Sequence, residues 1–192
     1  PSVDLPLHDT YFVVAHFHLI MGVAAIFGIF SATYFWFPKM FGKFLNEGVG
    51  KLHFWLTFAG VYCIFMPMHF LGIAGHERRY ADLNSVDYLG GATHSGLWSV
   101  QHFISLAAFV TITAQLLFLG NFIWGIFGGK RAEMNPWEAT TLEWTIPGPP
   151  PHDNFGGVIP EVYRGPYEFA VPGEKQDYVP QHLSPAEVAK GY

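Results

Sequence analysis

The stretch YFVVAHFHLIMGVAAIFGIFSATYFWF, residues 11–37, decides the fold of this chain. No Asp, Glu, Lys or Arg occurs between Asp9 and Lys39. At about 1.5 Å of rise per residue, a helix of this length crosses the roughly 30 Å of hydrocarbon in a bilayer. The sequence therefore predicts a membrane-spanning helix over about 11–37.

Two further charge-free windows follow, the first from Lys51 to Glu77 and the second from Asp87 to Lys130. The second window begins with a polar, glycine-containing part around Gly90 and Gly91, which we interpret as a loop. We predict spans at about 54–74 and 97–127, so that residues 1–131 hold three transmembrane helices. Three crossings place the two termini on opposite sides of the membrane.

The composition agrees with an all-α membrane protein rather than a soluble domain. Of the 192 residues, 51% are hydrophobic and only 13% are charged, where soluble domains carry about 25% charged residues. Cys63 is the only cysteine, which excludes a disulfide framework and a thiolate metal site. Because the chain starts with Pro1 rather than Met, we expect a processed product or the later part of a longer polypeptide.

Residues 132–192 have a different character, with ten of the fourteen prolines and no sustained helical or strand period. We predict an extended tail that lacks a core of its own. Residues 131–192 hold four Lys/Arg and nine Asp/Glu, which accounts for the net charge of -5. The chain therefore does not resemble a basic nucleic-acid binder.

The distribution of basic residues predicts the orientation of the spans. Five of them would lie on the side of the tail: Lys39, Lys43, Lys51, Lys130 and Arg131. Only Arg78 and Arg79 among the short connections would lie on the other side. Since basic residues concentrate in cytoplasmic loops, the tail is predicted to be cytoplasmic.

His16 and His18 lie inside the first predicted span, where an ionisable ring is expensive and indicates a functional site. On an α-helix, positions i and i+2 point about 200° apart, so the two rings face opposite sides and cannot bind one metal. Two large cofactors on either side of the helix would satisfy both, and haem iron is the natural candidate because imidazole is a common axial ligand. The alternative is that both rings bond to neighbouring helices or line a proton path.

Two polar motifs flank the spans on the side opposite the tail. His8 and Asp9 precede the first helix and could bind a hard cation or the polar edge of a cofactor. The alternative makes Asp9 the helix N-cap, and both roles are compatible. Arg78 and Arg79 follow the second span against the orientation rule, which suggests an anionic partner such as haem propionates, the alternative being a solvated pair.

Several motifs together resemble the C-terminal part of subunit I of the haem-copper oxidases, the aa3-type cytochrome c oxidase branch in particular. They recur in the family order over about residues 3–155: His8-Asp9-Thr10-Tyr11, His16-Phe17-His18, Pro67-Met68-His69-Phe70-Leu71-Gly72, Arg78-Arg79-Tyr80, Asn135-Pro136-Trp137-Glu138, Leu142-Glu143-Trp144 and Pro149-Pro150-Pro151. The chain departs from the family pattern at His76-Glu77 and at Phe12.

The resemblance implies that the three spans are the last three helices of a larger bundle. It also implies that His16 ligates the high-spin haem at which oxygen reacts, and that His18 ligates the low-spin haem. His8 and Asp9 would be magnesium ligands, and Arg78 and Arg79 would bind the propionates. The copper ligands and the second axial ligand of the low-spin haem would lie on helices outside this chain.

The expected function is thus part of a proton-pumping terminal oxidase that reduces oxygen to water with electrons from cytochrome c. Its expected cofactors are two haems, a-type, and magnesium. Its expected partners are the rest of subunit I, subunit II, other oxidase subunits, cytochrome c and membrane lipid, in a bacterial plasma membrane rather than a mitochondrial inner membrane. A quinol oxidase and a structural membrane subunit without haem remain alternatives.

Overall fold

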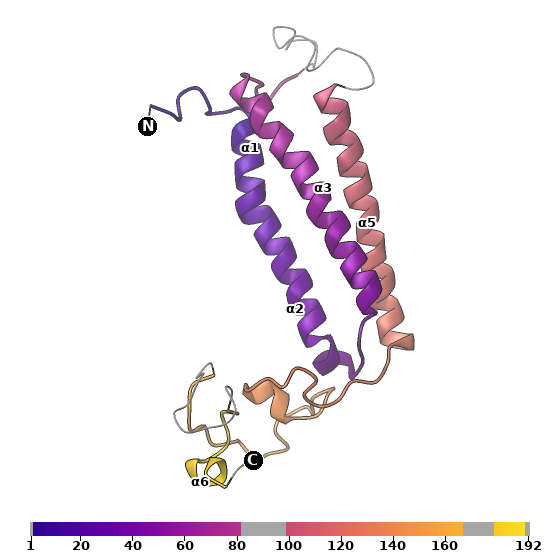
Figure 1. The fold of residues 1–192 in the computed structure, drawn as a ribbon, viewed down its shortest axis with the longest axis vertical. Coiled ribbons are helices and arrows are strands. Elements are labelled where there is room, and N and C mark those ends of the chain that lie inside the picture. Colours follow the sequence, from indigo (N-terminus) through magenta and orange to yellow (C-terminus); the bar gives the residue numbers. More distant parts are fainter. Residues whose placement is uncertain (1, 82–98, 167–178, 191–192) are drawn as a thin grey trace. The chain divides into compact units, whose positions relative to one another are not determined.

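The computed structural model describes residues 2–81, 99–166 and 179–190 (Figure 1). The described residues form helices and loops without a named strand, and three helices are long and apolar enough to cross a membrane. The fold is therefore that of an all-α membrane protein. Pro1, the expected loop at Gly90 and Gly91, and the expected start of the third span at Leu97 lie outside the described residues.

The first span runs from Tyr11 to Phe41 and is not uniformly α-helical. It comprises α1 (Tyr11–Phe17), a π-helical turn η1 (His18–Gly22) and α2 (Val23–Phe41). In the π turn, the amide of Val23 donates to the carbonyl of His18, which closes a wider ring than the α-helical one. Such turns inside α-helices are frequent at functional sites.

Thr10, rather than Asp9, caps this first helix. The hydroxyl oxygen of Thr10 accepts a hydrogen bond from the amide of Phe12 at 3.2 Å. Asp9 has a left-handed backbone with φ 57, and its carboxylate lies against Arg78. The alternative that made Asp9 the N-cap was wrong, because Asp9 lies in the turn before the helix and Thr10 supplies the capping side chain.

The other two spans are α3 (Glu47–Ile73) and α5 (Val100–Gly128). Helix α3 begins before the apolar window at 54–74, because the side chain of Asn46 accepts from the amide of Val49 at 3.0 Å and caps a polar first turn. Its N-terminal end is fixed to α5, since Asn121 accepts from the amide of Asn46 at 2.9 Å and donates to its carbonyl at 3.0 Å.

Glycines allow the helices to approach closely. A Cβ atom at Gly72 of α3 would collide with the backbone of Phe12 in α1. A Cβ atom at Gly60 of α3 would collide with the hydroxyl of Thr111 in α5. Small residues at such crossings are the usual means of packing membrane helices tightly. Many large apolar side chains remain exposed, including Phe70 (67%) and Phe109 (69%), and thus face lipid or further helices.

The chain divides into two compact units. The first contains Pro1–Ala32 and Asn46–Ile123, and therefore every candidate site residue named above. The second contains Thr33–Leu45 and Trp124–Tyr192, which includes a 3-10 turn η4 (Leu142–Thr145) and the short helix α6 (Pro185–Val188).

In the second unit, a buried lysine holds part of the tail against the end of α2. The ammonium group of Lys39 donates to the carbonyls of Met134, at 3.3 Å, and of Ile146. It also lies 5.0 Å from the ring centre of Trp144, which is only 1% exposed. The charge of Lys39 is thus used within the chain, where carbonyl groups and an aromatic face replace water.

Candidate functional site

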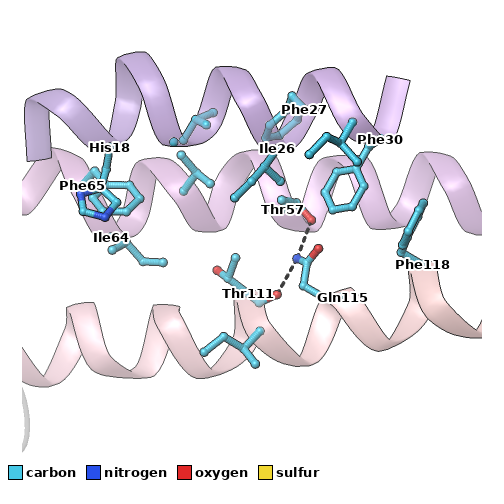
Figure 2. Close-up of a pocket in the computed structure, with 15 residues that line it drawn as sticks. His18, Ile26, Phe27, Phe30, Thr57, Ile64, Phe65, Thr111, Gln115 and Phe118 are labelled. Carbon is cyan, nitrogen blue, oxygen red and sulfur yellow. Dashed lines mark hydrogen bonds between the residues drawn. The ribbon is translucent and has the colours of Figure 1, made fainter. Parts of the chain in front are cut away.

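The ring of His18 points into an apolar pocket between the helices of the first unit (Figure 2). Its Nδ1 lies 2.8 Å from the carbonyl oxygen of Val14, one helical turn earlier. Because a carbonyl only accepts, Nδ1 carries the proton and Nε2 presents a free lone pair. The ring also stacks on Phe65 of α3, with 4.9 Å between centres and 15° between planes. These contacts fix both the tautomer and the orientation of the imidazole.

The pocket has a volume of about 500 Å³ and is lined almost entirely by aliphatic and aromatic side chains of the three spans. Figure 2 shows His18 and Phe65 at one end and Thr57, Gln115 and Phe118 towards the other. Gly22 adjoins His18 without filling the space with a side chain. A flat apolar cofactor that needs one nitrogen ligand has the chemical surroundings it requires here.

A polar network borders this pocket at Thr57, Thr111 and Gln115, away from His18. The side-chain amide of Gln115 donates to the hydroxyl of Thr57 at 3.1 Å and to the carbonyl of Thr111 at 2.8 Å. The ring Nε2 of His53 donates to the amide oxygen of Gln115 at 3.0 Å, and His53 is 2% exposed. Sequence reasoning missed this network, although polar residues inside charge-free windows could have signalled it.

His16 does not line the pocket of His18. It belongs to α1, is exposed, and stacks at long range on Phe12, with 6.3 Å between ring centres. The two histidines therefore have different surroundings, as their spacing requires. Any cofactor on His16 needs walls from outside the described residues.

His69 of α3 has the same local geometry as His18. Its Nδ1 lies 2.8 Å from the carbonyl oxygen of Phe65, so its Nε2 is also free of the proton. It meets Phe12 edge-on at 4.9 Å and does not line the pocket. The sequence motifs assign no ligand role to His69.

His8, Asp9 and Arg78 come together beside the N-terminus of α1. The Nε2 of His8 lies 3.4 Å from Oδ2 of Asp9, and Nε of Arg78 lies 2.9 Å from Oδ1 of the same carboxylate. His8 and Asp9 are largely exposed, with side-chain exposures of 70% and 57%, whereas that of Arg78 is 27%. Arg79, its neighbour, is exposed.

The His8–Asp9 pair suits a cation that takes few protein ligands. No group of three or more His, Cys, Asp or Glu side chains with metal-site geometry occurs among the described residues. Magnesium keeps several waters and needs only one or two carboxylates, so this pair fits as part of a site that other groups complete. Arg78 offsets part of the negative charge of Asp9, which disfavours a cation held by Asp9 alone.

His76, two residues before Arg78, is a second buried histidine, besides His53, to which sequence reasoning gave no role. It is 0% exposed and lies between Tyr11, Tyr80 and Gln101. In the sequence it stood out only as a departure from a family pattern.

Taken together, the first unit is a membrane helix bundle with an oriented imidazole in an apolar pocket and a polar cluster at one end. The comparisons with known proteins give this arrangement a family. Residues 1–106 match the family described as cytochrome c and quinol oxidase polypeptide I, and the chain belongs to this family.

Curated relatives include cytochrome c oxidase subunits of several bacteria. The chain is 48% identical over 184 residues to the alternative cytochrome c oxidase subunit 1 of Bradyrhizobium diazoefficiens, covering 95% of this chain and 30% of the relative. It is 41% identical over 174 residues to cytochrome c oxidase subunit 1 of Synechocystis sp., covering 91% of this chain and 30% of the relative. It is 42% identical over 158 residues to cytochrome c oxidase subunit 1 of Cereibacter sphaeroides, covering 80% of this chain and 26% of the relative. The chain thus spans about 30% of the length of its relatives.

Proposed function

We propose that this chain is part of the catalytic subunit of a terminal respiratory oxidase that reduces oxygen to water with electrons from cytochrome c, coupled to proton pumping. The observation that carries the proposal is the ring of His18, held by the Val14 carbonyl and directed into an apolar pocket. Family membership and the names of the relatives support the same reaction.

His18 is proposed as an axial ligand of a low-spin haem. The hydrogen bond that Nδ1 donates to the Val14 carbonyl fixes the orientation of the ring and leaves Nε2 available as a ligand. Phe65 supports one face of the imidazole, and the aliphatic wall of the pocket excludes water. When bound, the haem would supply one-electron redox chemistry. Its second axial ligand would come from helices outside this chain.

His16 is proposed as the axial ligand of a high-spin haem on another side of the first span. Its exposure in this chain leaves that face open to the remaining helices of the subunit. These helices would also carry the copper ligands. Because Phe17 separates the two histidines in the sequence, a short covalent path connects the two proposed cofactors.

The polar cluster beside α1 is proposed to bind magnesium and haem propionates. His8 and Asp9 would supply two ligands to the metal, with water and a neighbouring subunit completing its coordination. Arg78 and Arg79 would hold the propionates, because guanidinium groups bind carboxylates with paired hydrogen bonds. In this arrangement the Asp9 carboxylate orients Arg78 from behind.

The proposed surroundings follow from the family and the spans. Residues 1–131 would lie in a bacterial plasma membrane as the last three helices of subunit I, and residues 132–192 would lie on the cytoplasmic side. The partners would be the rest of subunit I, subunit II, other oxidase subunits and cytochrome c.

A pyridine haemochrome spectrum of the purified complex tests this function. The a-type haem is expected, whereas b-type or o-type haem would favour a quinol oxidase, which the family description also includes. A complex without haem would overturn both forms of the proposal. Turnover with reduced cytochrome c and with a quinol in the same preparation separates the two donors.

A further inference from the structure

His76 joins three helices at the end of the bundle that carries His8. It follows the C-terminus of α3, and its side chain is completely buried. Its ring stacks almost parallel on Tyr11 of α1, with 4.2 Å between centres and 9° between planes. From α5, the Nε2 of Gln101 lies 2.7 Å from the Nε2 of His76. One imidazole therefore contacts α1 and α5 from the end of α3.

Both ring nitrogens of His76 have a hydrogen-bond partner. Nδ1 lies 2.9 Å from the carbonyl oxygen of Glu77, which only accepts, so Nδ1 donates. Nε2 then accepts from the side-chain amide of Gln101. A phenyl ring could preserve the stacking on Tyr11, but it would leave the amide of Gln101 and the carbonyl of Glu77 without this partner.

The backbone around His76 reaches Asp9 directly. The amide of Tyr11 donates to the carbonyl of His76 at 2.9 Å, and the amide of Arg78 donates to the carbonyl of Asp9 at 2.9 Å. These two bonds run side by side and hold Asp9 in its left-handed conformation, φ 57, which costs free energy for a residue other than glycine. The same residue, Arg78, contacts the carboxylate of Asp9.

We propose that His76 is a positioning residue for the His8–Asp9 metal site. Its ring fixes the turn at Glu77, and that turn places Arg78 against both the backbone and the carboxylate of Asp9. This inference rests on the proposed function, because it assumes that His8 and Asp9 bind the metal. Outer contacts that orient metal ligands typically change metal affinity about 10-fold to 100-fold when they are lost.

The test uses the whole oxidase complex, with Mn²⁺ as the probe and its paramagnetic resonance signal as the readout. His76→Phe keeps the aromatic ring and removes both hydrogen bonds. We expect Mn²⁺ affinity to fall about tenfold, with a broadened signal. The matched control is His53→Phe, because His53 is also buried and also pairs with a glutamine of α5, but at the opposite end of α3. This control should leave the Mn²⁺ signal unchanged.

A second variant and a reference variant separate the possible failures. Gln101→Leu removes the partner of Nε2 and a hydrogen bond to the Tyr11 hydroxyl, and it leaves the bond of His76 to Glu77 in place. It should weaken Mn²⁺ binding less than His76→Phe, and it tests the proposal if His76→Phe does not assemble. If Asp9→Ala abolishes the signal while His76→Phe and Gln101→Leu leave it intact, the positioning role is wrong and the proposed metal site stands. If Asp9→Ala leaves the signal intact, the metal site and the inference both fail. An equal loss in His53→Phe would show a general structural effect and overturn the inference.

Discussion

His18 and His53 lie in neighbouring helices of the same bundle, yet their surroundings differ in kind. His18 binds a carbonyl of its own helix through Nδ1, and its other nitrogen faces an apolar pocket. His53 is 2% exposed and binds Gln115 of the next helix through Nε2. The first arrangement prepares a nitrogen for a ligand from elsewhere, whereas the second uses the ring to join two helices.

His18 differs from His53 in having an Nε2 without a hydrogen-bond partner among the described residues and a pocket in front of that nitrogen. His69 shares the Nδ1 bond of His18 but not its pocket, and His76 resembles His53 because a glutamine of α5 occupies its Nε2. A buried histidine in a membrane helix is therefore not by itself a cofactor ligand. Substitutions at these positions should distinguish a histidine that binds a cofactor from one that joins two helices.

The largest effect is expected at His18. In the full complex, His18→Ala should abolish the optical band of the low-spin haem, because no other imidazole among the described residues lines this pocket. The control is His69→Ala, which removes a ring with the same Nδ1 bond but outside the pocket and should keep the band. A band of full intensity in His18→Ala would refute the ligand role.

At His16, we expect a loss confined to one cofactor. His16→Leu should remove carbon monoxide binding and retain the low-spin haem band, because the two rings do not share a pocket. Difference spectra of the reduced complex with carbon monoxide provide the measurement. Simultaneous loss of both signals would mean that the two histidines do not serve separate cofactors.

The sequence was sufficient for the fold class and for the separate surroundings of His16 and His18. The length of a charge-free window and the angle between two positions of one helix are local features of the sequence. It was not sufficient for the turn at Asp9. The cap prediction used residue type alone, whereas the left-handed backbone of Asp9 depends on Arg78, which is distant in the sequence. For the same reason the glutamine partners of His53 and His76 could not be found, since Gln115 and Gln101 both lie on α5.

His53 should behave as a structural residue. His53→Leu leaves the amide oxygen of Gln115 without its donor, which we expect to cost about 0.5–2 kcal/mol of stability. Thermal unfolding of the complex should show the loss, while both haem spectra stay unchanged. In a double-mutant cycle with Gln115→Leu, the two losses should not add, because both variants break the same hydrogen bond. Loss of a haem band in His53→Leu would contradict the distinction from His18.

Arg78 should tune a redox potential modestly. A nearby cation favours the reduced, less positive haem, so Arg78→Gln should lower a midpoint potential. The Asp9 carboxylate, 2.9 Å from Nε of Arg78, offsets part of this charge, and we expect an effect of about 1 kcal/mol. Spectroelectrochemical titration measures it, with Arg79→Gln in parallel. Unchanged potentials in both variants would identify the pair as solvated charges.

The smallest effect on stability is expected at Asp9, and comparison with Thr10 makes it informative. Thr10→Ala removes the side chain that caps α1 and should cost about 1 kcal/mol, without changing Mn²⁺ binding. Asp9→Asn removes a charge that caps nothing, so its loss of stability should be smaller, limited to the contacts of a largely exposed carboxylate with His8 and Arg78. A metal ligand nevertheless needs the carboxylate, and Asp9→Asn should abolish the Mn²⁺ resonance. If Asp9→Asn destabilises the complex more than Thr10→Ala and leaves the resonance unchanged, the carboxylate stabilises the helix end rather than binding a metal.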